Sequence, residues 1–328
     1  MRVLADSEIR RLLDSGDLVI DPLPEDGSIQ PVSVDLRLGK AYAQKPGLDC
    51  IRLQEPFKED DYIDEVEFGD DMVIAPGDYR LLETIERLRM PEGISGIAVQ
   101  RSRMGRALVE GAGFGFSGSD YSMMRRSRMP EHVRYAFRPH AGTKLLRGDR
   151  ICQVVMFDMD GDGPISPDEA VSGGYLDVSE ETMRCGMCGS MVMFAGDVYA
   201  PKDGVTLSPG SGVDVDGCFD RVDDDVLPPG RAYLVRSRER FRFTEKVAGI
   251  VEGTMCQHLW HNQSLMHSCF AGLVDPGYEG NLMMQVYSNW GPIDRSKPMA
   301  IVTLYPVKGA VERVYGSKSL NSNHQGKF

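Results

Sequence analysis

Apolar residues near the N-terminus follow a helical pattern. Within residues 3–13 they recur at helical spacing, at Leu4, Ile9, Leu12 and Leu13. Asp6 or Ser7 has a side chain that can cap the first turn. The pattern predicts that one short amphipathic helix opens the chain.

Beyond this helix the apolar runs are short and rich in β-branched residues, and Gly, Pro or Asp bounds most of them. Seven runs are predicted strands, at residues 32–38, 93–99, 151–157, 232–235, 247–251, 282–287 and 300–305. Closely spaced strands are typical of sandwiches and barrels rather than of alternating β and α units. We therefore predict an all-β fold with a few short helices.

The chain also contains an internal repeat. Gly77, Glu86, Arg87, Arg89, Gly96 and Ile97 recur without a gap, at a constant offset of 153 residues, as Gly230, Glu239, Arg240, Arg242, Gly249 and Ile250. A repeat of domain length indicates two copies of one fold, since solenoid repeats have periods of roughly 20–50 residues. Chance agreement between two Pro-Gly turns is the alternative. We predict one domain over residues 1–172 and a second over residues 173–328.

Composition narrows the class of protein. The 328 residues are 41% hydrophobic, and their formal net charge of −12 argues against a broad nucleic-acid or anionic-membrane surface. No apolar run reaches membrane-spanning length and no signal peptide is recognisable, so we expect a cytoplasmic protein. The seven cysteines are an odd number, and we expect them to be reduced. Cys185 and Cys188 are spaced as half a zinc site, but no second Cys-x-x-Cys follows, and we expect no catalytic zinc.

The most informative segment is GLVDPGYEGNLMMQV, at residues 272–286. It places Asp275 and Tyr278 on a Gly/Pro turn that leads into an apolar strand, so a rigid sheet edge can hold both side chains. The segment resembles the motif of trimeric dUTPases, in which an aspartate activates water and a tyrosine lies against deoxyribose. It also resembles the Asp-Pro-Gly-aromatic turn of dCTP deaminases. The resemblance implies tandem dUTPase-like distorted β-barrels that bind a pyrimidine deoxynucleoside triphosphate, dCTP or dUTP, with Mg²⁺ on the triphosphate.

The segment IQPVSVDLRLG, at residues 29–39, resembles the N-terminal signature of dCTP deaminases. Its alternation of apolar and polar residues places Ser33, Asp35 and Arg37 on one face of a strand. A solvated face with a cross-strand ion pair is the alternative.

The basic segment QRSRMGR, at residues 100–106, resembles the Arg-Ser-Ser phosphate motif of both families, with Arg103 in place of the second serine. Arg101, Ser102 and Arg106 are candidate phosphate ligands, because guanidinium groups and hydroxyls bind phosphate oxygens. A basic surface loop is the alternative. The segment at residues 146–157 resembles the family's Gly-Asp-Arg-Ile-Ala-Gln strand. The resemblance makes Gln153 a candidate contact near the phosphates, and the alternative is that it is one polar residue of a core strand.

The C-terminal tail resembles the flexible lid that closes over the triphosphate in dCTP deaminases. Its candidate substrate contacts are Tyr315, Gln325 and Lys327. A disordered terminus is the alternative. Because sites in this superfamily are shared between protomers, the resemblance also implies a homo-oligomer, and a trimer is one candidate form.

One position departs from the deaminase pattern. The resemblance implies a glutamate as general base ten residues after Asp275, and this chain has Gln285 there. An amide does not accept a proton in the useful pH range. Asp275 and Gln285 are therefore the candidate catalytic positions, with dCTP deamination as the leading prediction. Hydrolysis of dUTP to dUMP and pyrophosphate by Asp275, and non-catalytic nucleotide sensing, are the alternatives.

Residues 158–169 match the oxygen positions of a twelve-residue calcium loop. The candidate ligands are Asp158, Asp160, Asp162 and Glu169. A predicted strand precedes this segment where a calcium loop has a helix. The alternative is therefore a solvated loop between the two domains.

Overall fold

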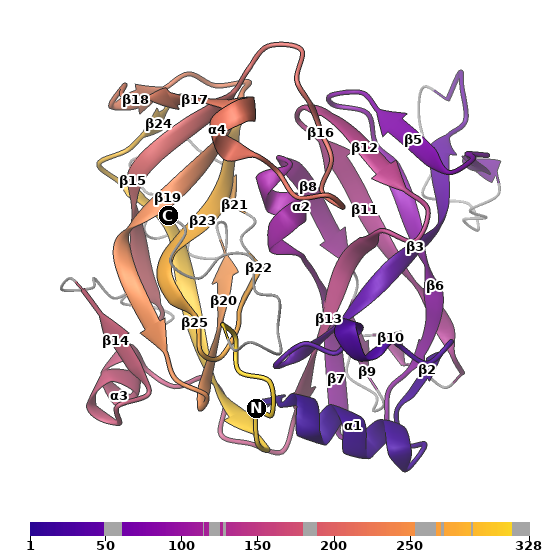
Figure 1. Ribbon diagram of the computed structural model, residues 1–328, viewed down its shortest axis with the longest axis vertical. Helices are drawn as coiled ribbons and strands as arrows, with labels where there is room; N and C mark the ends of the chain where they lie inside the picture. The colour runs from indigo at the N-terminus through magenta and orange to yellow at the C-terminus, as the bar shows by residue number, and fades with distance from the viewer. Residues whose placement is uncertain are drawn as a thin grey trace.

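The computed structural model describes residues 1–48, 61–113, 115–117, 125–126, 129–179, 189–252, 267–269, 272–289 and 291–316. The two halves of the chain form two β-rich bodies that lie side by side (Figure 1). No helix in these ranges is long and apolar enough to cross a membrane.

The first body contains β1 (Arg2–Leu4), α1 (Asp6–Asp14), β2 (Val19–Asp21), a 3₁₀ turn (Asp26–Ser28), β3 (Ser33–Gln44), β4 (Ile63–Glu65), β5 (Asp71–Ile74), β6 (Arg80–Arg89), β7 (Ile94–Gln100), α2 (Ser102–Arg106), β8 (Val109–Gly113), β9 (Gly115–Ser117), β10 (Arg125–Arg126), β11 (Glu131–Pro139), β12 (Gly142–Leu146) and β13 (Arg150–Asp158). The second half of the chain contains α3 (Pro167–Ser172), β14 (Leu176–Val178), β15 (Met191–Pro201), β16 (Thr206–Leu207), α4 (Val215–Cys218), β17 (Phe219–Val222), β18 (Val226–Leu227), β19 (Ala232–Phe243), β20 (Val247–Glu252), β21 (His267–Cys269), β22 (Gly272–Val274), β23 (Glu279–Ser288), β24 (Ile293–Asp294) and β25 (Pro298–Lys308). Of these elements, β16 pairs with β12 of the first body. All seven predicted strands are present, within β3, β7, β13, β19, β20, β23 and β25, so the all-β prediction is confirmed.

The two bodies repeat one strand arrangement. In the first, β3 pairs with β6 and β13, and β6 pairs with β11. In the second, β15 pairs with β19 and β25, and β19 pairs with β23. The short strand β1 joins the bodies, because it pairs antiparallel with β13 and parallel with β25.

A matching pair of side-chain hydrogen bonds occurs at equivalent places in both bodies. The Thr84 hydroxyl donates to the Glu86 carbonyl at 2.7 Å and accepts from the Val133 amide at 2.9 Å. The Ser237 hydroxyl makes the equivalent bonds, to the Glu239 carbonyl at 2.7 Å and from the Leu282 amide at 2.9 Å. Thr84 and Ser237 are separated by the offset of the sequence repeat, so the repeated residues occupy equivalent places.

Each body has its own hydrophobic cluster, but the clusters do not follow the midpoint of the chain. Leu207, Phe219 and Leu234 of the second half join the first cluster. Ala170, on α3, already belongs to the second. The exact division at residues 172 and 173 therefore stays a prediction.

The predicted N-terminal helix is present as α1, but the predicted cap is wrong. The residue at the N-cap position is Ala5, because residues 2–4 are extended in β1. Asp6 does not cap the helix; its buried carboxylate accepts instead from the backbone amides of Glu312 and Arg313, at 2.9 and 3.1 Å. These bonds hold the segment that follows β25 against α1.

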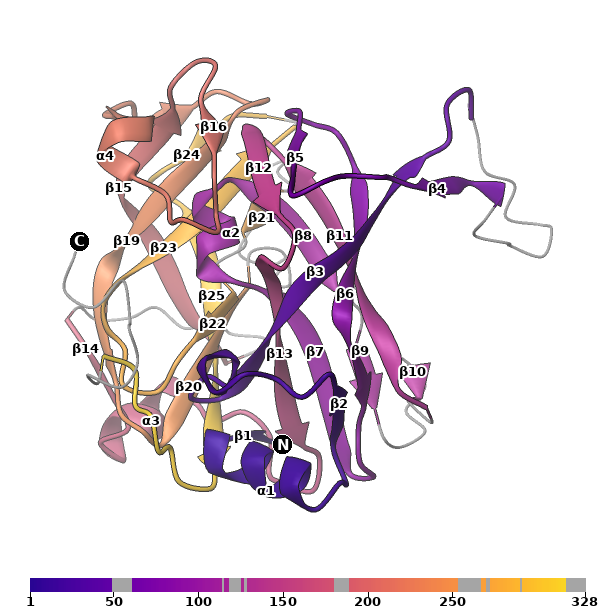
Figure 2. The same ribbon diagram turned by 45° about the vertical axis from the view of Figure 1, so that its right-hand side comes forward.

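The helix α2 lies between the two bodies, beside β8 of the first and β23 of the second, in both views of the molecule (Figures 1 and 2). Met104, Ala107 and Leu108 anchor it, since all three are buried in the first cluster. This placement brings the basic segment of the first half to the Gly/Pro turn of the second.

Candidate functional site

A pocket forms where α2 meets the end of β22 and the start of β23. Its lining residues are Ser102, Arg106, Leu273, Val274, Asp275, Tyr278, Leu282, Met283 and Tyr315. Five of these were predicted from sequence, and they come from segments far apart in the chain. All of these lining residues belong to one chain.

Local structure explains how α2 presents two polar side chains. The Gln100 side-chain amide donates to the Val109 carbonyl at 2.6 Å, which closes the segment that contains α2. Arg101 is extended, and the helix begins at Ser102. Ser102 and Arg106 are four residues apart, so they share one face of the helix.

Arg106 is a buried cation in this pocket. Only 7% of the residue is exposed, and burial lowers the pKa of its guanidinium, while the phenol oxygens of Tyr315 and Tyr278 act in the opposite direction. A guanidinium held away from bulk water binds an anionic oxygen more strongly than an exposed one does. Arg106 is therefore well placed to bind a phosphate.

The turn after β22 holds Asp275 in the pocket. Its backbone is closed by a hydrogen bond from the Tyr278 amide to the Asp275 carbonyl at 3.1 Å. The side-chain Oδ1 is shielded from solvent and has no hydrogen-bond partner among the described residues. Burial and the nearby Asp35 carboxylate raise the pKa of Asp275 to about 7, although Arg101 acts in the opposite direction. A carboxyl group in this state can take up and release a proton near neutral pH.

Two tyrosines close the pocket. Burial raises the pKa of Tyr278 to about 12 and raises that of Tyr315 as well, so both phenols stay protonated. The Tyr278 hydroxyl donates to the Asn281 carbonyl, and the Tyr315 amide donates to the Pro276 carbonyl at 3.0 Å. Tyr315 is thereby fixed over the turn that carries Asp275.

Three predicted residues lie outside the pocket lining. The Arg101 guanidinium pairs with the Asp35 carboxylate, with Nε 2.8 Å from Oδ1, and its role in phosphate binding stays a prediction. Gln153 is buried, and its amide is used internally: it accepts from the Ser33 hydroxyl at 3.1 Å and donates to the Gln100 carbonyl at 3.2 Å. Gln285 is fully buried on β23, and in the described part of the chain both its amide atoms lack a hydrogen-bond partner.

Four candidates lie beyond the described residues: Gln325, Lys327, Cys185 and Cys188. The sequence reasoning also missed the apolar walls of the pocket, formed by Leu273, Val274, Leu282 and Met283. The strand pattern of residues 282–287 was the available signal, since Met283 lies on the strand face opposite the Leu282, Met284 and Val286 core positions.

The candidate calcium ligands do not gather in the structure. Within the described ranges no group of three or more His, Cys, Asp or Glu side chains is placed to hold a metal. Asp158 is paired instead with Arg2 at 2.7 Å and Lys308 at 2.9 Å. Burial acts to raise the pKa of Asp158, but hydrogen bonds from Lys308, the Asp160 amide and Arg2 lower it to about 2. This carboxylate is therefore already balanced by two cations of the chain.

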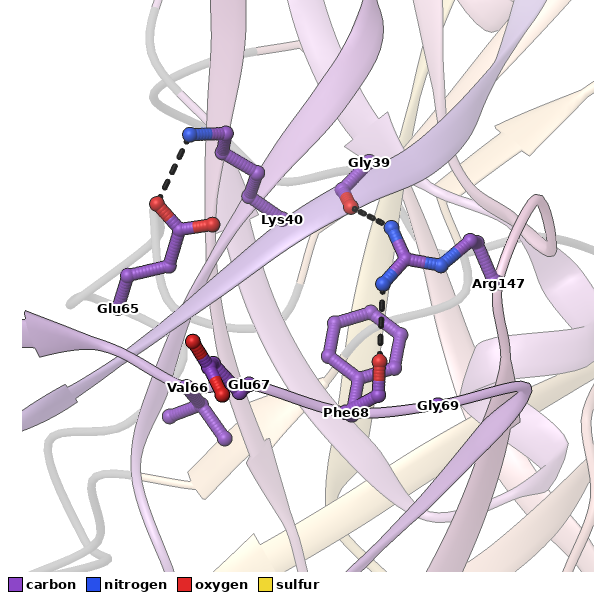
Figure 3. A pocket seen from close by; sticks show the side chains of 8 residues that line it. All are labelled: Gly39, Lys40, Glu65, Val66, Glu67, Phe68, Gly69 and Arg147. Carbon is purple, nitrogen blue, oxygen red and sulfur yellow. Dashed lines mark hydrogen bonds and ion pairs between the residues drawn. The ribbon is translucent and has the colours of Figure 1, made fainter.

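A second, open pocket lies against β3 and the segment between β4 and β5 (Figure 3). Two of its charged groups, Lys40 and Glu65, pair with each other at 2.8 Å. The Arg147 guanidinium stacks on the Phe68 ring and donates to the carbonyls of Gly39 and Phe68. None of the residues predicted to bind substrate lines this pocket.

Comparisons with known proteins agree with the fold and the predicted relationship. A family model described as dCTP deaminase-like matches residues 3–159 and 219–298. A dCTP deaminase of Natronomonas pharaonis is 40% identical over 112 residues, which are 33% of this chain and 57% of that protein. A "dCTP deaminase, dUMP-forming" of Methanosphaera stadtmanae is 32% identical over 176 residues, 48% of this chain and 80% of that protein. The chain thus spans little more than half the length of the first relative.

One solved structure resembles nearly the whole chain. The 2′-deoxycytidine 5′-triphosphate deaminase of Agrobacterium tumefaciens superposes with a TM-score of 0.74, covering 94% of this chain and 99% of that one. The sequences are 17% identical, so the likeness establishes the fold alone. The predicted fold class is confirmed.

Proposed function

This chain belongs to the dCTP deaminase-like family, and we propose that it binds a pyrimidine deoxynucleoside triphosphate between α2 and β22 and converts dCTP to dUTP. The proposal rests on the position and the pKa of Asp275. Asp275, a carboxyl group whose pKa burial raises to about 7, lines the same pocket as Ser102 and Arg106. The pocket combines a group for proton transfer with groups for phosphate binding.

The phosphate end of the substrate lies at α2 in this proposal. Arg106 supplies a buried guanidinium and Ser102 a hydroxyl one helical turn away. Mg²⁺ enters with the triphosphate, because the described residues offer no cluster of ligands for a resident metal. The metal is therefore part of the substrate, and the nucleoside end points toward Asp275.

Hydrolytic deamination needs a group that takes a proton from water and returns one to the leaving nitrogen. The Asp275 carboxylate accepts the proton as the water oxygen attacks C4 of cytosine. It then passes that proton to the amino nitrogen, the C4–N bond breaks, and ammonia leaves. The second proton of the water moves from the new C4 oxygen to N3, which gives the C4 carbonyl of uracil. A group with a pKa near 7 performs both transfers at neutral pH. Gln285 cannot, because an amide has no basic site in this range.

A second candidate function is hydrolysis of dUTP to dUMP and pyrophosphate. The observation that favours it is Gln285, where the deaminase pattern has a glutamate. Orienting a water molecule toward phosphorus requires only the ionised form of Asp275, and a Mg²⁺ ion on the triphosphate stabilises the developing charge.

The products separate these functions. Purified protein is incubated with Mg²⁺ and either dCTP or dUTP, and the nucleotides are resolved while ammonia and pyrophosphate are assayed. Ammonia and dUTP from dCTP are expected. Formation of pyrophosphate and dUMP from dUTP, with no product from dCTP, would instead establish the diphosphatase. Binding without any product would contradict both and leave a nucleotide sensor.

A further inference from the structure

Two arginines converge on one buried carboxylate beneath α2. The side chain of Asp35 is 1% exposed and lies on β3. Its Oδ1 is 2.8 Å from Arg101 Nε, and its Oδ2 is 3.3 Å from Arg150 Nη1. Arg101 also donates to the Arg150 carbonyl at 3.3 Å. Removing one member of such a buried cluster leaves an uncompensated charge, which is strongly unfavourable.

A second set of hydrogen bonds fixes the same place from the neighbouring strand. Ser33 donates to Gln153, and Gln153 donates to the carbonyl of Gln100, the last residue of β7. That carbonyl oxygen would be only 2.3 Å from a Cβ at Gly272, the first residue of β22. The backbones of the two halves therefore lie close together at Gln100 and Gly272. Gln100 directly precedes Arg101, and Gly272 is three residues before Asp275.

We propose that Asp35 is a positioning residue for the pocket: through Arg101 and Arg150 it fixes the start of α2 against the end of β22. In this role Arg101 links Asp35 to the helix that carries Ser102 and Arg106. The proposal deepens the proposed function, on which its catalytic consequence rests. Its structural part concerns the free protein and is independent of turnover.

Charge gives this arrangement a measurable consequence at Asp275. The ionisable groups around Asp275 are Asp35 and Arg101 in the first half, Arg106 on α2, and the phenols of Tyr278 and Tyr315. Burial raises the pKa of Asp35, although Arg101 and Arg150 act to lower it. In its ionised form Asp35 disfavours ionisation of Asp275, while the Arg101 cation favours it. Removing either charge must therefore move the titration of Asp275, in opposite directions.

The experiment follows the side-chain carboxyl carbon of Asp275 by ¹³C NMR during a pH titration of the full-length protein. Asp35→Asn keeps the shape of the side chain and removes its charge, so the pKa of Asp275 should fall by about one unit. Arg101→Gln leaves Asp35 facing Asp275 with less compensation, so the pKa should rise by a similar amount. The acid limb of the rate of ammonia release from dCTP should shift in the same two directions.

Glu86→Gln is the matched control. Glu86 is also a buried carboxylate paired with an arginine, Arg37, at 2.6 Å, but it is not among the groups that act on Asp275. The control substitution should lower thermal stability and leave the pKa of Asp275 unchanged. If Asp35→Asn does not fold, the upward shift in the pKa of Asp275 in Arg101→Gln tests the proposal on its own. Unchanged titration in the folded variants would overturn the proposal, whereas the two opposite shifts without ammonia release would overturn the proposed function alone.

Discussion

Tyr278 and Tyr315 pack against each other over the pocket, with ring centroids 5.7 Å apart. Tyr278 belongs to the turn after β22, and Tyr315 to the segment that follows β25. Gly277 makes this contact possible, because a Cβ at that position would lie 2.2 Å from Val314 Cγ1. The substrate pocket and the C-terminal segment are thus coupled through a glycine.

Gly277→Ala should displace the segment that carries Val314 and Tyr315. The glycine has a φ of +87°, so the substitution also strains the backbone, and a combined loss of about 2 kcal/mol in the free energy of unfolding is expected. Urea unfolding and the dissociation constant for dCTP measure the two effects. The control is Gly230→Ala, with a φ of +79° and no atom within 4 Å of the added Cβ. Equal effects on dCTP binding in both variants would contradict the coupling.

Arg106→Leu should weaken triphosphate binding by about 100-fold, because the variant loses a buried charge-assisted contact. Binding of the nucleoside deoxycytidine should change much less. Calorimetric titration with each ligand measures the difference. Arg103→Leu is the neighbouring control, since the Arg103 guanidinium donates to the Gly210 carbonyl at 2.9 Å. An Arg106→Leu protein that binds dCTP as well as the Arg103→Leu protein would refute the phosphate role.

Stability should fall as pH rises through the range in which Asp275 ionises. The pKa of this carboxyl is about 7 in the folded protein and near 3.8 when unfolded, so the folded state binds more protons between these values. Its contribution to stability is present below the unfolded pKa and is lost as pH rises toward 7. Asp275→Asn should therefore reduce the decline in unfolding free energy between pH 5 and pH 8 by about 1–3 kcal/mol. An unchanged decline, measured by urea unfolding, would show that Asp275 titrates normally.

Gln285 and Gln153 form a matched pair of buried amides with different surroundings. Gln285→Met should stabilise the protein by about 1 kcal/mol, because in the described structure the amide of Gln285 lacks any hydrogen-bond partner. Gln153→Met should destabilise it by about 1–3 kcal/mol, because it leaves Ser33 and the Gln100 carbonyl without their partner. The same sign for both substitutions in thermal unfolding would contradict this difference.

The sequence predicted the strands well because their apolar patterns are local. The sequence repeat is also present in the structure, where Thr84 and Ser237, separated by the same offset, make equivalent hydrogen bonds. The N-terminal helix was predicted correctly, but its cap was not, because the Asp6 carboxylate accepts instead from the backbone amides of Glu312 and Arg313. Such contacts depend on residues far away in the chain and leave no signal in the segment itself.

The candidate site was predicted in part, for a similar reason. Ser102, Arg106, Asp275, Tyr278 and Tyr315 were found through their motifs and do meet in one pocket. Motif composition could not reveal where a long side chain points, and Arg101 turns to a buried carboxylate on another strand. The ion pair considered as an alternative for the segment at residues 29–39 is therefore present and involves Asp35, but the face is not solvated, because Ser33 and Asp35 are buried.

Ammonia release from dCTP by the Asp275→Asn variant, compared with the unmodified protein, tests the central claim most directly. The amide keeps the shape of the side chain but cannot accept a proton, so the account predicts a loss of at least about 100-fold in turnover with dCTP binding retained within about tenfold. Turnover equal to that of the unmodified protein would remove Asp275 from the chemistry and contradict the account.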